Sequence, residues 1–439
     1  MISTRKSMLI SMLFIAATAR AQEVKLTLEE ALNAALTNNK EVTMARMDEE
    51  AAITRLKQTQ AVFFPQINLS YAAMSSNNPL NAFGFKLQQQ SITASDFNPE
   101  LLNSPSATHN FMSKAEWKQP LLNMDILQAR QGAREQVNAV GFQSQRTKQY
   151  LTLEVEKAYA QLQMAHQARR VMEETLDMMK AVYRATSNRY DKGYLQKSDV
   201  LQVEVQVASA ESAFAESKSN VRNASDYLSL LMGSNTNAIY SVDSIYFVHS
   251  PDVADNAEPP QNRADFLAMQ SVVNAHERMM QSGKMAYVPR LNAFGEYLIN
   301  DSDALGFGSN SYLVGAQLSW TIFNGMATRN RIQEQRIERN KAAEQLAYRK
   351  HQAQVELNKA VRQREDTKFD MAKQNISVNQ AAEAVRIMEN RYHQGLVSTN
   401  DLLQAQTLVS QQKLNRAQAV FRFNTTNAYI KFLTSTSEK

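Results

Sequence analysis

Two short segments of the sequence share four of six side chains in the same order. Residues 188–193 read Asn-Arg-Tyr-Asp-Lys-Gly and residues 390–395 read Asn-Arg-Tyr-His-Gln-Gly, and an aspartate, Asp199 or Asp401, follows each glycine six residues later. A glycine suits a turn with positive φ, which a β-carbon disfavours. A carboxylate just beyond such a turn can accept hydrogen bonds from the free N–H groups of a starting helix. The pattern therefore predicts two turns between helices, each with an acid at the start of the second helix.

Side chains that would indicate catalysis or a resident metal are not gathered anywhere in the sequence. The six histidines are scattered, none forms a His-x-x-x-His pair, and there is no cysteine. The segment Gly306-Phe307-Gly308 lacks the third glycine and the strand–helix context of a dinucleotide-binding loop. The 20 methionines are expected to fill gaps in helix seams, with copper handling as the alternative. We expect no enzyme, no cofactor and no metal site.

The first 21 residues have the organisation of a secretory signal peptide. Arg5 and Lys6 precede an apolar stretch of ten residues, and Ala19-Arg20-Ala21 offers a small-x-small cleavage site. Ten residues are too few for a membrane-spanning helix, which needs about 20. Removal of this segment lowers the formal net charge from +5 to +2, because it holds three basic residues and no acid. We therefore expect export, and no nucleic-acid partner.

An internal repeat divides the chain of 439 residues into two halves. Seven identities (Asn, Arg, Tyr, Gly, Asp, Leu and Gln) between residues 188–202 and 390–404 occur at a constant offset of 202 residues. Residues 63–67 (Phe-Phe-Pro-Gln-Ile) are echoed by residues 287–291 (Tyr-Val-Pro-Arg-Leu). We predict a signal peptide over residues 1–21, a first repeat over 22–232, a linker over 233–261 and a second repeat over 262–439. Each repeat is expected to contain a helix, two strands and a long helical hairpin.

Long helices are predicted on both sides of each turn. Apolar residues recur at alternating steps of four and three before the first turn, at Leu151, Val155, Ala158, Leu162 and Ala165. This period is the signature of a coiled coil. Residues 124–190 contain no proline and could form one helix of roughly 100 Å. Helical seams alone are also compatible with a structural coiled-coil protein without a pore, in the periplasm or at the cell surface.

Four segments alternate apolar and polar residues, as expected for strands with one apolar face. The apolar positions are Ile67, Leu69 and Tyr71; Phe111, Ala115 and Trp117; Leu291, Ala293, Tyr297 and Ile299; and Tyr312, Val314, Ala316, Leu318 and Trp320. Trp117 and Trp320 fall near strand ends, where membrane proteins place an aromatic girdle. Four strands cannot close a barrel, and open sheet edges do not survive in lipid. A membrane location therefore requires that several chains contribute strands.

Several of these features together resemble TolC-like outer-membrane efflux proteins. They are the opening Leu26-Thr27-Leu28-Glu29-Glu30-Ala31-Leu32, the pair Asn38-Asn39, the duplicated Arg-Tyr-x-x-Gly turn followed by Asp-hydrophobic-Leu, and strands that begin after a proline. The resemblance covers essentially the whole mature chain. It implies a mainly α fold with a membrane β-barrel portion: a homotrimer whose chains each give four strands to a twelve-stranded barrel and their helices to a periplasmic α-barrel.

The resemblance also implies a function and a location. The protein would be a passive exit duct of a tripartite efflux or type I secretion system, in contact with lipid of the outer membrane of a Gram-negative bacterium and extending into the periplasm. There it would meet a periplasmic adaptor (membrane fusion protein) and, through it, an inner-membrane transporter. Residues 76–110 and 301–310 would face outside the cell, and residues 233–261 would belong to a belt around the tunnel.

By resemblance, the two turns form the periplasmic tip, and the docking residues for the adaptor are Gly193, Ser198, Asp199, Gly395, Asn400 and Asp401. The pore entrance would be gated by Tyr392 and Asp199 from neighbouring hairpins. Asp401 keeps one position of an acidic ring, whereas Gln404 occupies the next acidic position and Val397 replaces an arginine of the best-known members. The alternative for both aspartates is helix capping, and the two roles are compatible.

Overall fold

The computed structural model describes residues 23–234, 238–246 and 257–437. The predicted signal peptide lies outside the described residues, and so does part of the predicted linker over 233–261. The described chain divides into two compact units. Unit 1 comprises the described residues up to Thr43 together with 147–260 and 353–435; unit 2 comprises 44–146, 261–352 and the described residues after Ser435. Each unit therefore draws on both predicted repeats.

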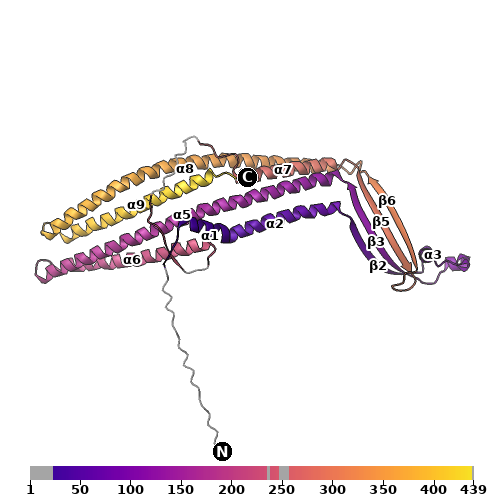
Figure 1. The fold of residues 1–439 in the computed structure, drawn as a ribbon, viewed down its shortest axis with the longest axis horizontal. Coiled ribbons are helices and arrows are strands. Elements are labelled where there is room, and N and C mark those ends of the chain that lie inside the picture. The colour runs from indigo at the N-terminus through magenta and orange to yellow at the C-terminus, as the bar shows by residue number, and fades with distance from the viewer. Residues whose placement is uncertain (1–22, 235–237, 247–256, 438–439) are drawn as a thin grey trace, which may run out of the picture. The chain divides into compact units, whose positions relative to one another are not determined.

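One order of elements occurs twice along the chain (Figure 1). The first half contains α1 (Leu28–Asn38), α2 (Lys40–Gln60), β2 (Gln66–Ser76), β3 (Thr108–Leu122), α5 (Met124–Asp191) and α6 (Lys197–Leu231). The second half contains α7 (Ala264–Met285), β5 (Arg290–Asp301), β6 (Ser309–Ser319), α8 (Ala327–His393) and α9 (Thr399–Leu433). The predicted fold class is confirmed: α5 and α8 have 68 and 67 residues, and each continues through a short turn into a helix of 35 residues.

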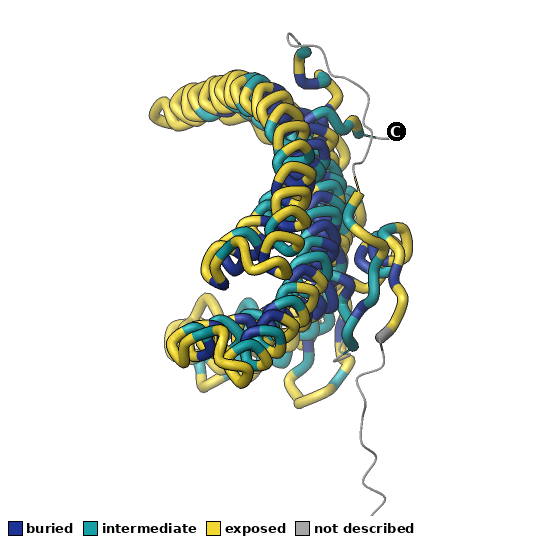
Figure 2. Tube along the Cα trace, turned by 90° about the vertical axis from the view of Figure 1, so that its left-hand side faces the viewer, coloured by how far each residue is buried: buried dark blue, intermediate teal, exposed yellow. Residues whose placement is uncertain are grey.

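Unit 1 is built from helices that bury their alternating apolar positions against one another. Leu151, Val155 and Leu162, three of the predicted seam residues of α5, are at most 1% exposed and pack against Ala31 and Ala35 of α1 in one apolar cluster. Figure 2 shows buried positions gathered where neighbouring helices meet and exposed positions on their outer sides. The seam period therefore explains how these long helices find their partners.

A small parallel sheet in unit 1 was missed by the sequence analysis. β1 (Glu23–Lys25) pairs with β4 (Ile239–Ser241), and Tyr240 of β4 joins the apolar cluster around α1. Three-residue strands are too short to show alternation, so no periodic signal could reveal them.

The end of α6 lies against the end of α1. Gly233 has φ +66°, and a β-carbon there would lie 2.4 Å from the carbonyl oxygen of Asn38. Asn39 donates to the carbonyl oxygen of Leu231 at 2.8 Å, which explains the Asn-Asn pair after α1.

Unit 2 contains a four-stranded antiparallel sheet with the order β2-β3-β5-β6. The predicted strands are all present. The register places Leu69 opposite Ala115, Ala115 opposite Tyr297, and Tyr297 opposite Tyr312. The predicted apolar positions of the four strands consequently share one face. No helix in the described part of the chain is both long and apolar enough to cross a bilayer.

Residues 76–110, which were expected to face outside the cell, contain helices that their sequence had not indicated. They are α3 (Pro79–Gln88), a 3₁₀ turn over Ala94–Phe97 and α4 (Pro99–Asn103). Asn78 and Asn98 cap α3 and α4, and each is followed by a proline at the first helical position. This helical segment, like β2 and β3 on either side of it, belongs to unit 2.

Candidate functional site

The two predicted turns have the same backbone geometry. Gly193 has φ +78° and Gly395 has φ +73°. In the first turn the N–H of Gly193 donates to Tyr190 and that of Tyr194 donates to Arg189; the second turn repeats both hydrogen bonds 202 residues later. This is the Schellman arrangement, in which a left-handed residue ends a helix. A β-carbon at either glycine would meet no atom within 4 Å, so φ alone demands glycine.

Both predicted aspartates cap the helix that follows the turn. A carboxylate oxygen of Asp199 accepts the N–H of Gln196 at 3.0 Å. Asp401 accepts the hydroxyl of Ser398 at 2.7 Å and its N–H at 3.1 Å, and the Ser398 hydroxyl accepts the N–H of Asp401 at 3.2 Å. The hydroxyl and N–H of Ser398, with a smaller contribution from Arg391, lower the pKa of Asp401 below its ordinary value. Capping is thus observed, whereas the entrance role stays a prediction.

Tyr392 is buried where the two hairpins meet within one chain. Its side chain is 2% exposed, and its hydroxyl lies 3.0 Å from the hydroxyl of Thr186 and 3.4 Å from that of Thr399. The guanidinium of Arg189 lies 4.4 Å from the centre of its ring. The same guanidinium donates to the carbonyl oxygens of Tyr392 at 2.8 Å and of His393 at 3.2 Å. These contacts tie the last turn of α8 to α5.

The predicted gating pair of Tyr392 and Asp199 is not joined within a single chain. The Tyr392 hydroxyl is engaged by two threonines, and Asp199 accepts from Gln196. Of the other predicted tip residues, Ser198, Asn400 and Gln404 are exposed, and Asn400 accepts a hydrogen bond from Gln202 at 3.0 Å. Their roles in docking and gating stay predictions.

The side chains that hold the two hairpins together were not predicted from the sequence. Thr186 and Thr399 carry no signal beyond their place beside the turns, and Gln202 belongs to the internal repeat but was given no role. Arg189 was part of the repeated motif, but its reach across to α8 required the structure. Val397, which stands where an arginine was expected by resemblance, packs against an apolar cluster at the tip. The members of this tip cluster come from both hairpins: Leu176, Met179, Val182, Val203, Ala210, Tyr392, Leu402 and Leu403.

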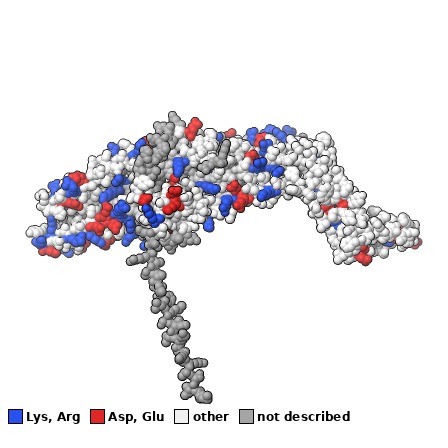
Figure 3. Space-filling model, in the orientation of Figure 1, with Lys and Arg blue, Asp and Glu red and all other residues white. Residues whose placement is uncertain are grey.

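In unit 2, the apolar face of the sheet is exposed in the single chain. The exposed fraction is 81% for Leu69, 68% for Ile67, 76% for Tyr312, 68% for Val314 and 67% for Leu318. One row across the sheet joins Ile67, Trp117, Gly295 and Val314. Few charged side chains appear on the side of the sheet region seen in Figure 3. A continuous apolar face of this extent indicates a surface that another apolar phase covers.

The opposite face of the sheet carries charged residues in close contact. Lys114 of β3 lies 2.6 Å from Glu116 and 2.9 Å from Glu296 of β5, and Lys118 lies 3.6 Å from Glu116. Strand alternation forces these side chains away from the apolar face. The sheet therefore has one face suited to lipid and one suited to water.

Both tryptophans lie toward the same end of the sheet, the end at which β2 and β5 begin. Trp117 pairs with Ile67, the second residue of β2. Trp320 follows β6 directly, is 60% exposed and donates its indole N–H to the carbonyl oxygen of Tyr287 at 2.9 Å. Phe64 and Phe323, which the sequence analysis did not assign, are also exposed beside the strand ends. This clustering supports the girdle assignment, which stays a prediction.

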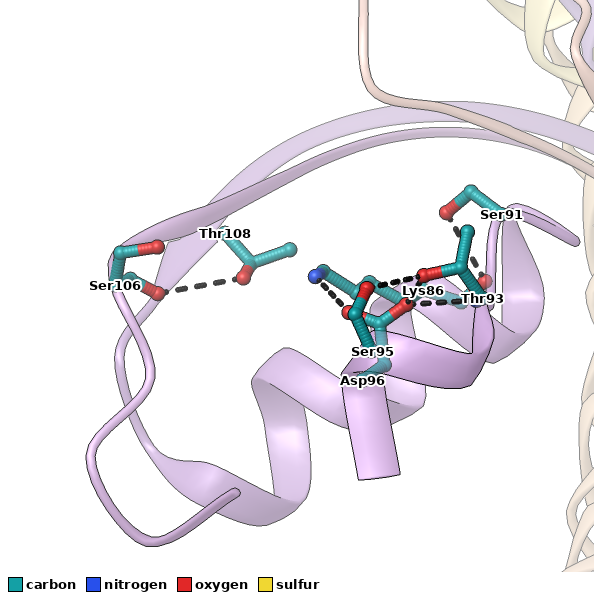
Figure 4. Close-up of polar contacts among 7 residues, drawn as sticks. All are labelled: Lys86, Ser91, Thr93, Ser95, Asp96, Ser106 and Thr108. Carbon is teal, nitrogen blue, oxygen red and sulfur yellow. Dashed lines mark hydrogen bonds and ion pairs between the residues drawn. The ribbon is translucent and has the colours of Figure 1, made fainter. Parts of the chain in front are cut away.

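The helical segment between β2 and β3 is held by a compact polar network (Figure 4). Lys86 of α3 lies 2.6 Å from Asp96, whose carboxylate also accepts the N–H of Thr93 at 2.7 Å and its hydroxyl at 2.9 Å. The hydrogen bonds from Lys86 and Thr93 lower the pKa of Asp96 to about 2. These contacts give residues 79–103 a defined shape.

Comparison with known proteins places the chain among outer-membrane channels. The profile of the family described as outer membrane efflux protein matches residues 31–234 and 259–433. No curated protein matches the sequence. Among solved structures, CusC, described in connection with transmembrane channel formation, is 16% identical with a TM-score of 0.77, over 97% of this chain and 96% of its own.

Two further structures show the same fold. The outer membrane channel CmeC of Campylobacter jejuni is 16% identical with a TM-score of 0.78, over 93% of this chain and 85% of its own. The outer membrane protein VceC of Vibrio cholerae is 16% identical with a TM-score of 0.76, over 93% of this chain and 96% of its own. The match extends over helices and strands alike.

Proposed function

Since the chain belongs to the outer membrane efflux protein family, we propose that it is one subunit of a trimeric outer-membrane channel that acts as a passive exit duct. The observation that carries the proposal is the four-stranded sheet with an exposed apolar face. Its edge strands, β2 and β6, each pair with only one strand among the described residues. Backbone groups at such edges cannot remain unpaired in lipid. Three chains with four strands each supply enough strands for a closed barrel.

Each face of the sheet then has a defined environment. The face with Leu69, Tyr312 and Val314 contacts lipid of the outer membrane, and the face with Lys114, Glu116 and Glu296 lines the water-filled interior. Trp117 and Trp320 lie in one interfacial girdle. A membrane barrel with these faces conducts solutes without a chemical step, which fits a duct rather than an enzyme.

The helical hairpins extend into the periplasm, and their turns form its end. Gly193, Ser198, Asp199, Gly395, Asn400 and Asp401 meet a periplasmic adaptor, which connects the duct to an inner-membrane transporter. Membership of the outer membrane efflux protein family supports this assembly. At the tip, Asp401 is exposed and its lowered pKa keeps it ionised near neutrality. Three such carboxylates favour cations at a narrow entrance, with Gln404 one helical turn further on.

Conductance in planar bilayers tests the proposal. Purified mature protein should run as a trimer in mild detergent and give discrete single-channel steps. A monomer without conductance would show instead a structural coiled-coil protein without a pore. Fractionation with the outer membrane, rather than with the soluble periplasm, is the matching observation in cells.

A further inference from the structure

Two segments leave the sheet at its outer end, the end at which β2 and β5 finish and β3 and β6 begin. One is the helical segment over residues 79–103, which follows β2, and the other is the loop over residues 302–308, which joins β5 to β6. The proposed channel places both segments at the outer mouth of the barrel. Their contacts with the strands show that they lie on different faces of the sheet.

The end of α3 is fixed to the charged face of the sheet. Asn110 of β3 lies four positions from Lys114, so both side chains are on that face. Asn110 and Asn300 of β5 are at most 2% exposed, and the amide of Asn110 donates to the side-chain oxygen of Asn300 at 3.0 Å. The side-chain amide of Gln89, the residue after α3, donates to the side-chain oxygen of Asn110 at 3.0 Å. α3 therefore ends on two buried asparagines of the charged face.

α3 is long enough to cross the whole outer end of the sheet. It begins next to β2, where the N–H of Asn78 donates to the hydroxyl of Ser76 at 3.1 Å. It ends next to β6, where the hydroxyl of Ser309 donates to the carbonyl oxygen of Gln88. Its ten residues extend about 15 Å, and the three spacings between four neighbouring strands add up to about 14 Å. α3 therefore runs across the charged face from one edge strand to the other.

The loop over residues 302–308 leans toward the other face. The N–H of Leu305 donates to the hydroxyl of Tyr71 at 3.1 Å, and Tyr71 belongs to the apolar face of β2. The carboxylate of Asp301 fixes the loop by accepting the N–H of Asp303 at 2.9 Å and that of Gly308 at 2.7 Å. The apolar face thus receives this loop, and the charged face receives α3.

One side of α3 is open to solvent in the single chain. Leu80 and Leu87 are 81% and 54% exposed. A β-carbon at Gly84, which lies between them on the same side, would meet no atom within 4 Å. Another side, with Phe83 and Lys86, faces the 3₁₀ turn and α4 across a cavity of about 310 Å³. The polar network in Figure 4 fixes the segment that carries the open side.

We propose that α3 of each copy forms a shelf inside the outer mouth of the barrel and limits the size of the solutes that pass. The inference rests on the proposed channel, in which the charged face of the sheet lines the water-filled interior. A helix with its side chains is about 10–12 Å across, so a shelf on each third of the rim fills a large part of the opening. Leu80, Gly84 and Leu87 border the passage that remains.

The shelf acts on solutes by size rather than by charge. The three residues on its open side carry no ionisable group, whereas the proposed entrance at the other end of the duct is bordered by Asp401. Bulky solutes are therefore retarded at the outer mouth, and small ions of either sign pass. The passage thus has a second constriction, built by a segment that lies outside the helical hairpins.

Modification of single cysteines tests the shelf, since the chain has no cysteine of its own. Leu80→Cys and Leu87→Cys lie on the open side of α3, and Ala304→Cys, an exposed position in the loop over residues 302–308, is the matched control. Each variant is reconstituted in planar bilayers and treated on both sides with fluorescein maleimide. The conductance should fall in up to three steps, one for each copy, with either cysteine on α3, and should stay constant with Ala304→Cys.

Release of the shelf should have the opposite effect. Gln89→Ala removes the amide that donates to Asn110 and to the carbonyl oxygen of His109 at 2.7 Å. The largest polyethylene glycol that enters the pore, measured by its effect on conductance, should become larger. Gln90→Asn is the control, because Gln90 is exposed and asparagine tolerates its φ of +56°.

The outcomes separate the shelf from the channel itself. A conducting wild-type protein whose cysteines on α3 react without any change in conductance would overturn the shelf and leave the proposed function standing. Cysteines at both α3 positions that fluorescein maleimide does not reach in a conducting channel would do the same. A wild-type protein that gives no conductance would overturn the proposed function.

Discussion

Within one chain, the hairpins bury their apolar side chains more completely than the sheet does. In the hairpins, α5 packs on α6 and α8 on α9, and seam residues such as Leu151 and Val203 are at most 1% exposed. In the sheet, every strand has its apolar side chains on one face, yet Leu69 is 81% exposed. Helices pair most of their backbone N–H and C=O groups internally, whereas a four-stranded sheet leaves such groups unpaired at its two edges. The seams within each hairpin are therefore buried in a single chain, whereas the apolar face of the sheet requires lipid and its edges require further copies.

The strongest test of this contrast is a charge placed on either face of β2. Leu69→Lys should cost about 2–4 kcal/mol in membrane stability, since it brings an ammonium group to the lipid face. Asn68→Lys is the adjacent residue on the opposite face, across from Glu116, and should have little effect. Trimer yield in the outer-membrane fraction and urea resistance in lipid vesicles measure the difference. Equal loss in both variants would show that the two faces do not differ in environment.

The next test concerns the turns, which combine a structural requirement with a proposed docking role. Gly395→Val forces a β-branched residue to φ +73° and should cost about 1–3 kcal/mol locally. We expect weaker crosslinking to the adaptor and reduced efflux, while the barrel still forms trimers. Gly395→Asn is the control, because asparagine tolerates the left-handed region. Unchanged adaptor binding in Gly395→Val would place docking elsewhere on the hairpins.

Periodicity and turn chemistry made most of the fold predictable. The 3.5-residue seam predicted α5 and α8, the two-residue alternation predicted all four strands of the sheet, and both glycines of the repeated turns have positive φ. Two features were missed. β1 and β4 have three residues each, too few for a period, and the helices over residues 79–103 are held by caps and by Lys86 with Asp96 rather than by an amphipathic pattern.

The candidate site was less predictable than the fold, because its contacts join residues about 200 positions apart. The repeat identified Tyr392, Arg189 and Asp401 as members of a motif. It could not show that Tyr392 is buried against Thr186, while Tyr190, which also follows Asn-Arg, is 38% exposed. The difference in exposure between the two tyrosines depends on how the two hairpins pack against each other, which the sequence repeat does not contain.

The two tyrosines therefore offer a smaller and sharper test within the hairpins. Tyr392→Phe removes the hydroxyl bonded to Thr186 and Thr399 and should lower the free energy of unfolding by about 1 kcal/mol. Tyr190→Phe, the counterpart in the other turn, should change it by much less, because the Tyr190 hydroxyl makes no hydrogen bond among the described residues. Thermal unfolding of the purified protein in detergent measures both. A Tyr190→Phe variant that loses as much stability as Tyr392→Phe would contradict the asymmetry between the hairpins.

The smallest expected effect on stability belongs to Asp401, where capping and channel function must be separated. Hydrogen bonds from Ser398 lower the pKa of Asp401 in the folded protein. The contribution of the cap to folding stability is therefore fully present above the pKa of the unfolded state. It is lost as the pH falls through the lowered pKa of the folded state. Between pH 7 and 5 the cap should therefore be constant. Asp401→Ala removes both the charge and the acceptor, whereas Asp401→Asn removes the charge and keeps an oxygen for the Ser398 N–H.

If Asp401 lines the entrance, both variants should reduce cation preference and cation block in planar bilayers at pH 7 to a similar extent, and only Asp401→Ala should also lower the unfolding temperature. The charge acts on ions through the potential of three converging carboxylates, which the amide lacks, while the cap depends on an acceptor that the amide retains. Unchanged ion selectivity in Asp401→Asn would show that the carboxylate serves the helix alone. In that case the second turn, like the seams of its hairpin, would be complete within one chain.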